Sequence, residues 1–135
     1  MGNRAVITDV EKNIGIYLHW NGGRDSVEGF LTYCKMRGFR FDDYGRARFC
    51  QIVANFFGGD GLSIGIDLYD RCDTDNWDNG VYVVDNWEIV ERLYMRNDEQ
   101  DEYPLYNMLI VIDDKQPEEQ KLGTDKIREL YEKMM

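Results

Sequence analysis

The sequence predicts an α+β fold in which an antiparallel sheet of about five strands carries three to four helices packed mainly on one face. Five segments alternate apolar and polar residues with the period of a strand, and four others repeat apolar residues with the period of a helix. Several strand segments follow one another through short turns, which favours hairpins. The 135 residues suit a single domain, 1–135.

The first two strands are predicted at Arg4–Val10 and Ile14–Trp20. In both segments apolar residues recur at alternate positions, so each strand is expected to turn one apolar face toward the core. Lys12 and Asn13 are expected to form the turn between them, because two polar residues interrupt the alternation there. The two strands are therefore expected to form a hairpin.

Two helices are expected next. The first has Asp25 or Ser26 as its N-cap, and the second spans Tyr44–Phe57 with Asp42 or Asp43 as its N-cap, since these side chains accept hydrogen bonds from free backbone N–H groups. Spacing of the apolar residues in the second helix predicts one buried stripe. It consists of Ala47, Cys50, Val53, Ala54 and Phe57.

Three further strands are predicted at Leu62–Tyr69, Gly80–Val84 and Trp87–Met95. Asp85 and Asn86 are expected to form a two-residue hairpin turn between the last two, because Asp and Asn tolerate the positive φ of such turns. The three segments together predict an antiparallel meander.

Two more helices complete the predicted fold. Pro104 suits the first residue of one helix, and Pro117 ends it, since proline fits a helix start and cannot continue a helix. The last helix begins near Thr124. Both helices repeat apolar residues on one side, so each is expected to bury one face.

Charge and cysteine content exclude several classes of function. The formal net charge of −10 opposes direct binding of nucleic acid and of anionic membranes, and it favours a basic partner protein. No apolar run is long enough for a membrane span. Three widely spaced cysteines do not form a disulfide framework, so a reducing cytoplasm is expected.

The negative charge is concentrated in residues 60–102, which hold thirteen acidic and three basic residues and so account for the whole imbalance. An exposed face with regularly placed carboxylates resembles a phosphate backbone electrostatically, and a groove that binds nucleic acid attracts it. We therefore expect a partner-binding surface in this segment. The candidate residues are Asp67, Asp70, Asp73, Asp75, Asp78, Asp85, Glu88 and Glu91.

A zinc site is a further candidate, because imidazole and thiolate groups are preferred zinc ligands. The ligands would come from a subset of His19, Cys34, Cys50 and Cys72. The paired short spacing of a zinc finger is missing, and two of these cysteines fall on predicted buried stripes, where cysteine packs as a small apolar residue. No other cofactor is expected, since the chain has no phosphate-binding loop and no hydrolase motif.

Several segments resemble small phage and prophage proteins that share an Arg-containing first strand and an aromatic-His-Trp-Asp/Asn-Gly motif. The motif is present here as Ile16-Tyr17-Leu18-His19-Trp20-Asn21-Gly22-Gly23, and the other similar segments are residues 2–7, 47–51, 55–59, 78–80 and 86–90. Within this group the chain resembles an anti-CRISPR protein that acts on a type II RNA-guided nuclease.

The resemblance implies a non-enzymatic, phage-encoded inhibitor that works in the cytoplasm of the bacterial host. Its acidic surface would occupy a basic region of the effector nuclease and block loading of target DNA. Two alternatives stay open. One is a small-molecule or nucleotide-binding anti-defence module with its pocket at the His19 corner, and the other is a metal-dependent enzyme centred on His19.

Overall fold

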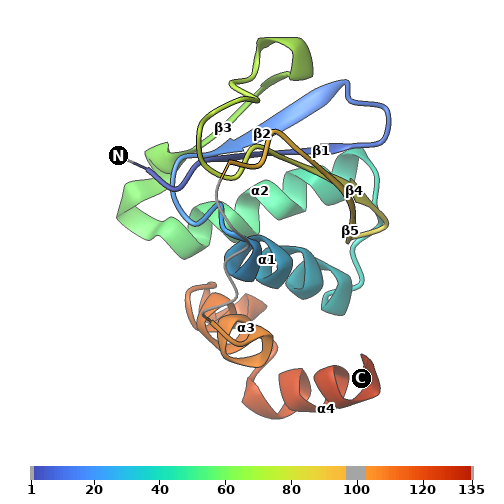
Figure 1. The fold of residues 1–135 in the computed structure, drawn as a ribbon. Coiled ribbons are helices and arrows are strands. Elements are labelled where there is room, and N and C mark those ends of the chain that lie inside the picture. Colours follow the sequence, from blue (N-terminus) through green and yellow to red (C-terminus); the bar gives the residue numbers. More distant parts are fainter. Residues whose placement is uncertain (1, 97–102, 135) are drawn as a thin grey trace.

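The computed structural model describes residues 2–96 and 103–134, with the backbone alone for residues 60–62. The described residues form five strands and four α-helices, which confirms the α+β class (Figure 1). In chain order these are β1 (Ala5–Asp9), β2 (Ile14–Leu18), α1 (Arg24–Met36), α2 (Asp43–Phe57), β3 (Ile64–Leu68), β4 (Val81–Asp85), β5 (Glu88–Leu93), α3 (Leu105–Asp114) and α4 (Thr124–Met134).

The sheet has the strand order β3-β2-β1-β4-β5, and it is mixed, because β4 runs parallel to β1 while the other neighbours are antiparallel. The predicted hairpin of β1 and β2 is confirmed. The predicted antiparallel sheet and the meander of β3, β4 and β5 are wrong, since β3 pairs with β2. Residue alternation identifies strands but does not choose their neighbours. The long connection 69–80 carries the chain across the sheet and lets β4 join β1.

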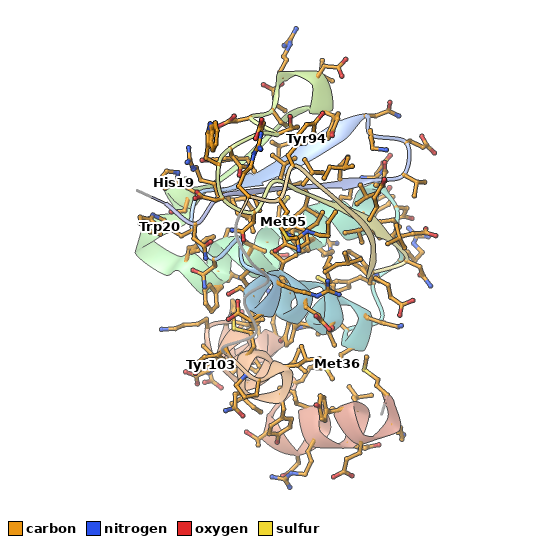
Figure 2. All side chains as sticks on the ribbon, viewed as in Figure 1. His19, Trp20, Met36, Tyr94, Met95 and Tyr103 are labelled. Carbon is orange, nitrogen blue, oxygen red and sulfur yellow. The ribbon has the colours of Figure 1, made fainter. Side chains whose placement is uncertain are left out.

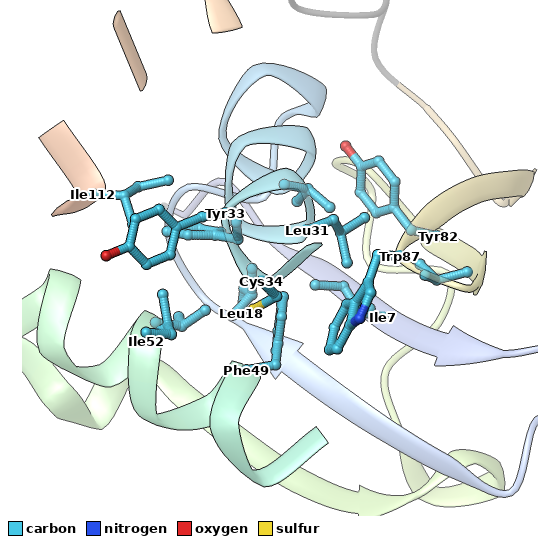
Figure 3. Close-up of a cluster of buried hydrophobic side chains, with 14 of the residues drawn as sticks. Ile7, Leu18, Leu31, Tyr33, Cys34, Phe49, Ile52, Tyr82, Trp87 and Ile112 are labelled. Carbon is cyan, nitrogen blue, oxygen red and sulfur yellow. The ribbon is translucent and has the colours of Figure 1, made fainter. Parts of the chain in front are cut away.

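The two faces of the sheet are covered differently. On one face, residues such as Ile7, Leu18 and Tyr82 form the main core with α1 and α2 (Figure 3). On the other face, a smaller apolar cluster is covered by the connection 69–80. Its members are Val6, Val81 and Val83, with Tyr17, Tyr69, Cys72 and Leu93 packed against them. The central strands β1 and β4 are therefore buried on both sides.

All four helices lie on the same side of the sheet (Figure 1). The prediction that the helices pack mainly on one face of the sheet holds in part, because only two of the described helices pack on the sheet itself. α1 and α2 pack against the sheet, α3 packs on α1, and α4 packs on α3. Each outer helix buries its apolar stripe on the helix beneath it, so the helices form successive layers.

The N-terminus of α1 differs from the prediction, whereas that of α2 confirms it. Gly23 is the N-cap of α1 and provides no side-chain hydrogen bond, and both Asp25 and Ser26 lie in the first turn. A carboxylate in this turn is still favourable because it faces the positive end of the helix dipole. In α2, an Oδ1 atom of Asp42 accepts a hydrogen bond from the Gly45 N–H at 3.0 Å.

The buried stripe of α2 is rotated from the predicted one. Gly45, Phe49, Ile52 and Val53 are buried, while Ala47 is exposed. Phe49 determines this orientation, because its ring packs edge-to-face on Phe30 and stacks on Trp87. Burial of the large Phe49 ring removes more apolar surface from water, and so stabilises the fold more, than burial of the small Ala47 side chain would.

The β4–β5 turn consists of Asn86 and Trp87, one residue later than predicted. Both have positive φ, 49° and 67°, as a type I′ turn requires. The Trp87 side chain is buried, and its Nε1–H donates a hydrogen bond to the Phe39 carbonyl at 2.8 Å. Burial of the indole thus stabilises a turn conformation that is unfavourable for tryptophan by itself.

A buried carboxylate fixes the outer helices to α1. Asp113 accepts hydrogen bonds from the Tyr33 hydroxyl at 2.5 Å and from the N–H groups of Leu122 and Gly123 at 2.8 and 3.0 Å. Burial, and then the hydrogen bond to Asp113, raise the pKa of Tyr33. The hydroxyl therefore stays protonated and keeps donating to the carboxylate.

Candidate partner-binding loop

Residues 72–80, which we call the acidic loop, connect the 3₁₀ turn η2 (Tyr69–Arg71) to β4 and lie on the helix-free side of the sheet. Asn76 holds the loop together and is only 1% exposed. Its amide nitrogen donates to the carbonyls of Asp73 and Gly80 at 3.0 and 3.3 Å. Its amide oxygen accepts from the N–H groups of Asp78 and Gly80 at 3.2 and 3.0 Å. One side chain thus replaces the backbone pairing that a regular element would supply.

The end of the acidic loop is attached to the start of β1. Asp78 accepts hydrogen bonds from the backbone N–H and the Nε–H of Arg4, at 3.2 and 2.8 Å. The hydrogen bond to Asp78 is the main reason that the pKa of Arg4 is raised. The Asn79 N–H donates to the Arg4 carbonyl at 3.0 Å. These contacts join segments more than seventy residues apart and fix the loop on the sheet.

Trp77 lies in the middle of this fixed loop and points into solvent. Its side chain is 69% exposed, and its φ is 63°, a conformation that costs a non-glycine residue about 1–2 kcal/mol. Burial of a tryptophan side chain normally stabilises a fold, so the exposed position of Trp77 lowers the stability of this one. The Arg96 guanidinium lies 4.8 Å from the Trp77 ring centroid and covers part of the ring.

Arg96 is itself fixed by Asp75. Its Nε and Nη2 atoms donate to the two Asp75 oxygens at 2.9 and 2.7 Å, a bidentate pair. This hydrogen bonding lowers the pKa of Asp75. The Arg96 N–H also donates to the Asp78 carbonyl at 3.1 Å. Asp75, Trp77 and Arg96 therefore form a preorganised surface group, which we call the Trp77 platform.

The eight predicted partner-binding carboxylates occupy two regions. Asp67 lies on β3, Asp70 on η2, and Asp73, Asp75 and Asp78 on the acidic loop; Asp85 ends β4, and Glu88 and Glu91 lie on β5. The two regions start from opposite edges of the sheet, β3 and β5. Tyr69 lies on the connection, and its pKa is raised mainly by burial, with smaller contributions from neighbouring groups that include Glu91 and Asp70.

Some of this negative charge is balanced by neighbouring cations. Asp78 and Asp75 form short pairs with Arg4 and Arg96. The carboxylates of Asp73, Glu88 and Glu91 lie 3.9–4.0 Å from a lysine or arginine nitrogen. An ion pair of this length at an exposed site contributes little to stability. Among the described residues, Asp67, Asp70 and Asp85 form no ion pair. The expected role of the eight residues in binding stays a prediction.

The four candidate zinc ligands do not come together. Cys34 lies in the core between the helices and the sheet, and Cys50 lies half-buried on α2. Cys72 packs on the opposite face of the sheet. Burial raises the pKa of all three thiols, which disfavours the thiolate form that binds zinc. Within residues 2–96 and 103–134, no group of three or more His, Cys, Asp and Glu side chains is placed to hold a metal ion.

His19 is packed against its surroundings. The Tyr17 hydroxyl lies 2.9 Å from His19 Nδ1, and the ring meets Trp20 edge-to-face at 5.3 Å between centroids. The His19 carbonyl accepts a hydrogen bond from the Asn3 N–H at 2.9 Å, which holds the N-terminal segment beside β2. Figure 2 shows His19 and Trp20 together at one side of the molecule. These contacts brace the corner after β2.

A surface cleft of about 260 Å³ lies elsewhere, between α1, the β4–β5 hairpin, α3 and α4. Leu31, Trp87 and Leu105 provide apolar walls, and Arg24 and Lys35 lie among the charged lining residues. His19 does not line this cleft, and the pocket expected at the His19 corner stays a prediction.

Sequence reasoning located the acidic loop but missed Asn76, Trp77 and Arg96 as its organising residues. One signal was available, since a single tryptophan stands among Asp, Asn and Gly in a segment that is otherwise typical of a polar turn. The contact of Arg96 with Trp77 joins separate parts of the chain and had no local signal.

Comparison of the chain with models of protein families, with curated protein sequences and with solved structures finds no match in any of the three. Across the part of the chain that the structure describes, no helix has the length and apolar character needed to cross a bilayer.

Proposed function

We propose that this protein is a non-catalytic inhibitor that binds a basic, nucleic-acid-binding protein through the acidic loop. The observation that carries the proposal is the exposure of Trp77 at positive φ in a loop held rigid by buried Asn76. Tryptophan, tyrosine and arginine are enriched among the residues that dominate binding energy at protein interfaces. A rigid loop also loses little conformational entropy when it binds.

The chemistry of the Trp77 platform favours a cationic group on the partner. Arg96 covers part of the indole, and the remaining exposed ring surface attracts a lysine or arginine through a cation–π interaction of about 0.5–2 kcal/mol. Asp70 and Asp73, both exposed, supply carboxylates on the same connection. The net charge of −10 adds long-range attraction to a basic surface.

For the particular partner, we propose a type II CRISPR effector nuclease, with loading of target DNA as the blocked step. The similarity of the Ile16–Gly23 segment to phage and prophage proteins supports this choice. Such nucleases hold nucleic acid in a positively charged channel, which is the kind of surface that an acidic loop complements.

The test is a guided-nuclease cleavage assay in which purified protein is added before target DNA. Wild-type protein should inhibit cleavage, Trp77→Ala should weaken inhibition at least tenfold, and Tyr44→Ala should inhibit like wild type. Tyr44 is a matched control because it is 67% exposed, as Trp77 is, but lies on α2. Full cleavage at large molar excess with several type II nucleases would overturn the proposed partner, and equal inhibition by all three proteins would overturn the proposed surface.

A further inference from the structure

β3 is the terminal strand of the sheet next to β2, and its outer edge is apolar. Ile66 at its centre is 62% exposed, and Leu68 and the neighbouring Ile14 of β2 are exposed as well. Every second residue of β3 lies on the helix side of the sheet. These residues are Ile64, Ile66 and Leu68, which pair with Leu18, Ile16 and Ile14 of β2. We call these three β3 residues and Ile14 the β3 edge patch.

The backbone of β3 presents free hydrogen-bonding groups at this edge. The His19 N–H donates to the Ser63 carbonyl at 2.8 Å and the Tyr69 N–H to the Asn13 carbonyl at 2.9 Å. In an antiparallel pair, hydrogen-bonded positions alternate. The groups of Gly65 and Asp67 therefore point toward β2, and those of Ile66 point outward. The Leu68 N–H is already bound by the Asp67 carboxylate at 2.7 Å.

The opposite edge of the sheet is protected, whereas the β3 edge is not. β5 carries Glu88, Glu91 and Arg92 and has an irregularity in its pairing with β4 at Val83 and Val84. Charged residues and bulges are the usual means by which edge strands avoid pairing with other chains. β3 has no proline or lysine, and Asp67 is its one charged residue.

We propose that two copies of this chain associate by antiparallel pairing of their β3 strands, with Ile66 of one copy opposite Ile66 of the other. The N–H and C=O groups of the two Ile66 residues then bond to each other. Ile64 lies opposite Leu68 of the second copy, so the β3 edge patches form one apolar stripe. The two five-stranded sheets become one continuous sheet.

The sequence of β3 fits a second copy, because this register is self-complementary. It places Asp67 of each copy opposite Gly65 of the other, and thus avoids a directly opposed pair of like charges. A side chain built at Gly65 would meet no atom within 4 Å, so the position has room for the carboxylate. Two-fold symmetric pairing of identical patches is the commonest form of self-association.

Salt distinguishes this contact from partner binding. Two copies that each carry −10 repel one another, so added salt should strengthen the dimer. Salt should weaken binding of the acidic loop to a basic protein, because there the charges attract. The two proposals are therefore independent, and failure of one leaves the other standing.

Analytical ultracentrifugation of the full chain tests the dimer. At about 100 µM protein, the average mass should exceed 15.9 kDa and approach twice that value as NaCl rises from about 0.05 to 0.5 M. Ile66→Lys and Ile66→Pro should each weaken association at least tenfold. The proline variant removes the outward N–H together with the isoleucine side chain, and it leaves the pairing with β2 in place.

Val90→Lys is the matched control, since Val90 is 55% exposed on the opposite edge strand, β5. It should self-associate like wild type, and circular dichroism should show all four proteins folded. A monomeric wild type under these conditions, or a dimer that persists in both Ile66 variants, would overturn the proposal.

Discussion

Replacement of Asn76 by alanine should destabilise the fold from within the acidic loop. The Gly80 N–H, a buried group, loses its acceptor, and leaving a buried donor unpaired costs about 1–3 kcal/mol. The Gly80 carbonyl keeps a partner, because it also accepts from the Val6 N–H at 2.8 Å. The remaining bonds reach Asp73 and Asp78, which are nearer to solvent, and their loss adds about 0.5–1 kcal/mol. We expect a total loss of about 1.5–4 kcal/mol.

Urea unfolding followed by far-ultraviolet circular dichroism measures this loss as a fall in the midpoint at unchanged slope. Asn107→Ala is the control, because Asn107 is exposed on α3, where alanine is the better helix former; its stability should change by less than about 0.5 kcal/mol. A similarly small effect of Asn76→Ala would refute the argument that Asn76 holds the acidic loop rigid.

Three further predictions follow from the structure. Gly80→Ala should cost more than about 3 kcal/mol in chemical unfolding and Gly38→Ala only about 1 kcal/mol, because both have φ near 70° but only at Gly80 does an added Cβ collide with backbone, the carbonyls of Leu93 and Tyr94; equal costs would refute this. Asp113→Ala should lower stability by about 3 kcal/mol, since it takes the acceptor from the buried Tyr33 hydroxyl and from the part-buried N–H groups of Leu122 and Gly123, and a Tm shift below a few degrees would contradict it. The pKa of Asp75 is lowered, so its bond to Arg96 should hold above the ordinary carboxyl value of 3.8 and break as pH falls below it; the Trp77 indole NMR signal should then shift in the wild type but not in Asp75→Asn.

Local features of the fold were predictable from the sequence. The β1–β2 hairpin and the Asp42 cap of α2 depend on residues close together in the chain, so alternation and capping chemistry suffice to find them. The partner of β3 was not predictable in this way. Several strands have the same alternation, and the choice between β2 and β4 is made by packing over distant segments.

Tertiary packing also overrides local turn chemistry at Trp87. Asp85 and Asn86 are the better turn residues, yet the turn forms at Asn86 and Trp87 because the indole gains a buried site beside Phe49. The same reason explains the rotation of α2. In the candidate site, composition indicated the acidic segment, but only coordinates bring Arg96 onto Trp77.

The measurement that tests the central claim most directly is site-specific photo-cross-linking to the effector nuclease. Trp77 or, as the control, Tyr44 is replaced by benzoylphenylalanine, and each protein is irradiated with the guide-loaded nuclease. We expect a covalent adduct from position 77 that excess wild-type protein competes away, and none from position 44. An adduct from position 44 alone would place the contact on α2 and contradict the acidic loop as the binding surface.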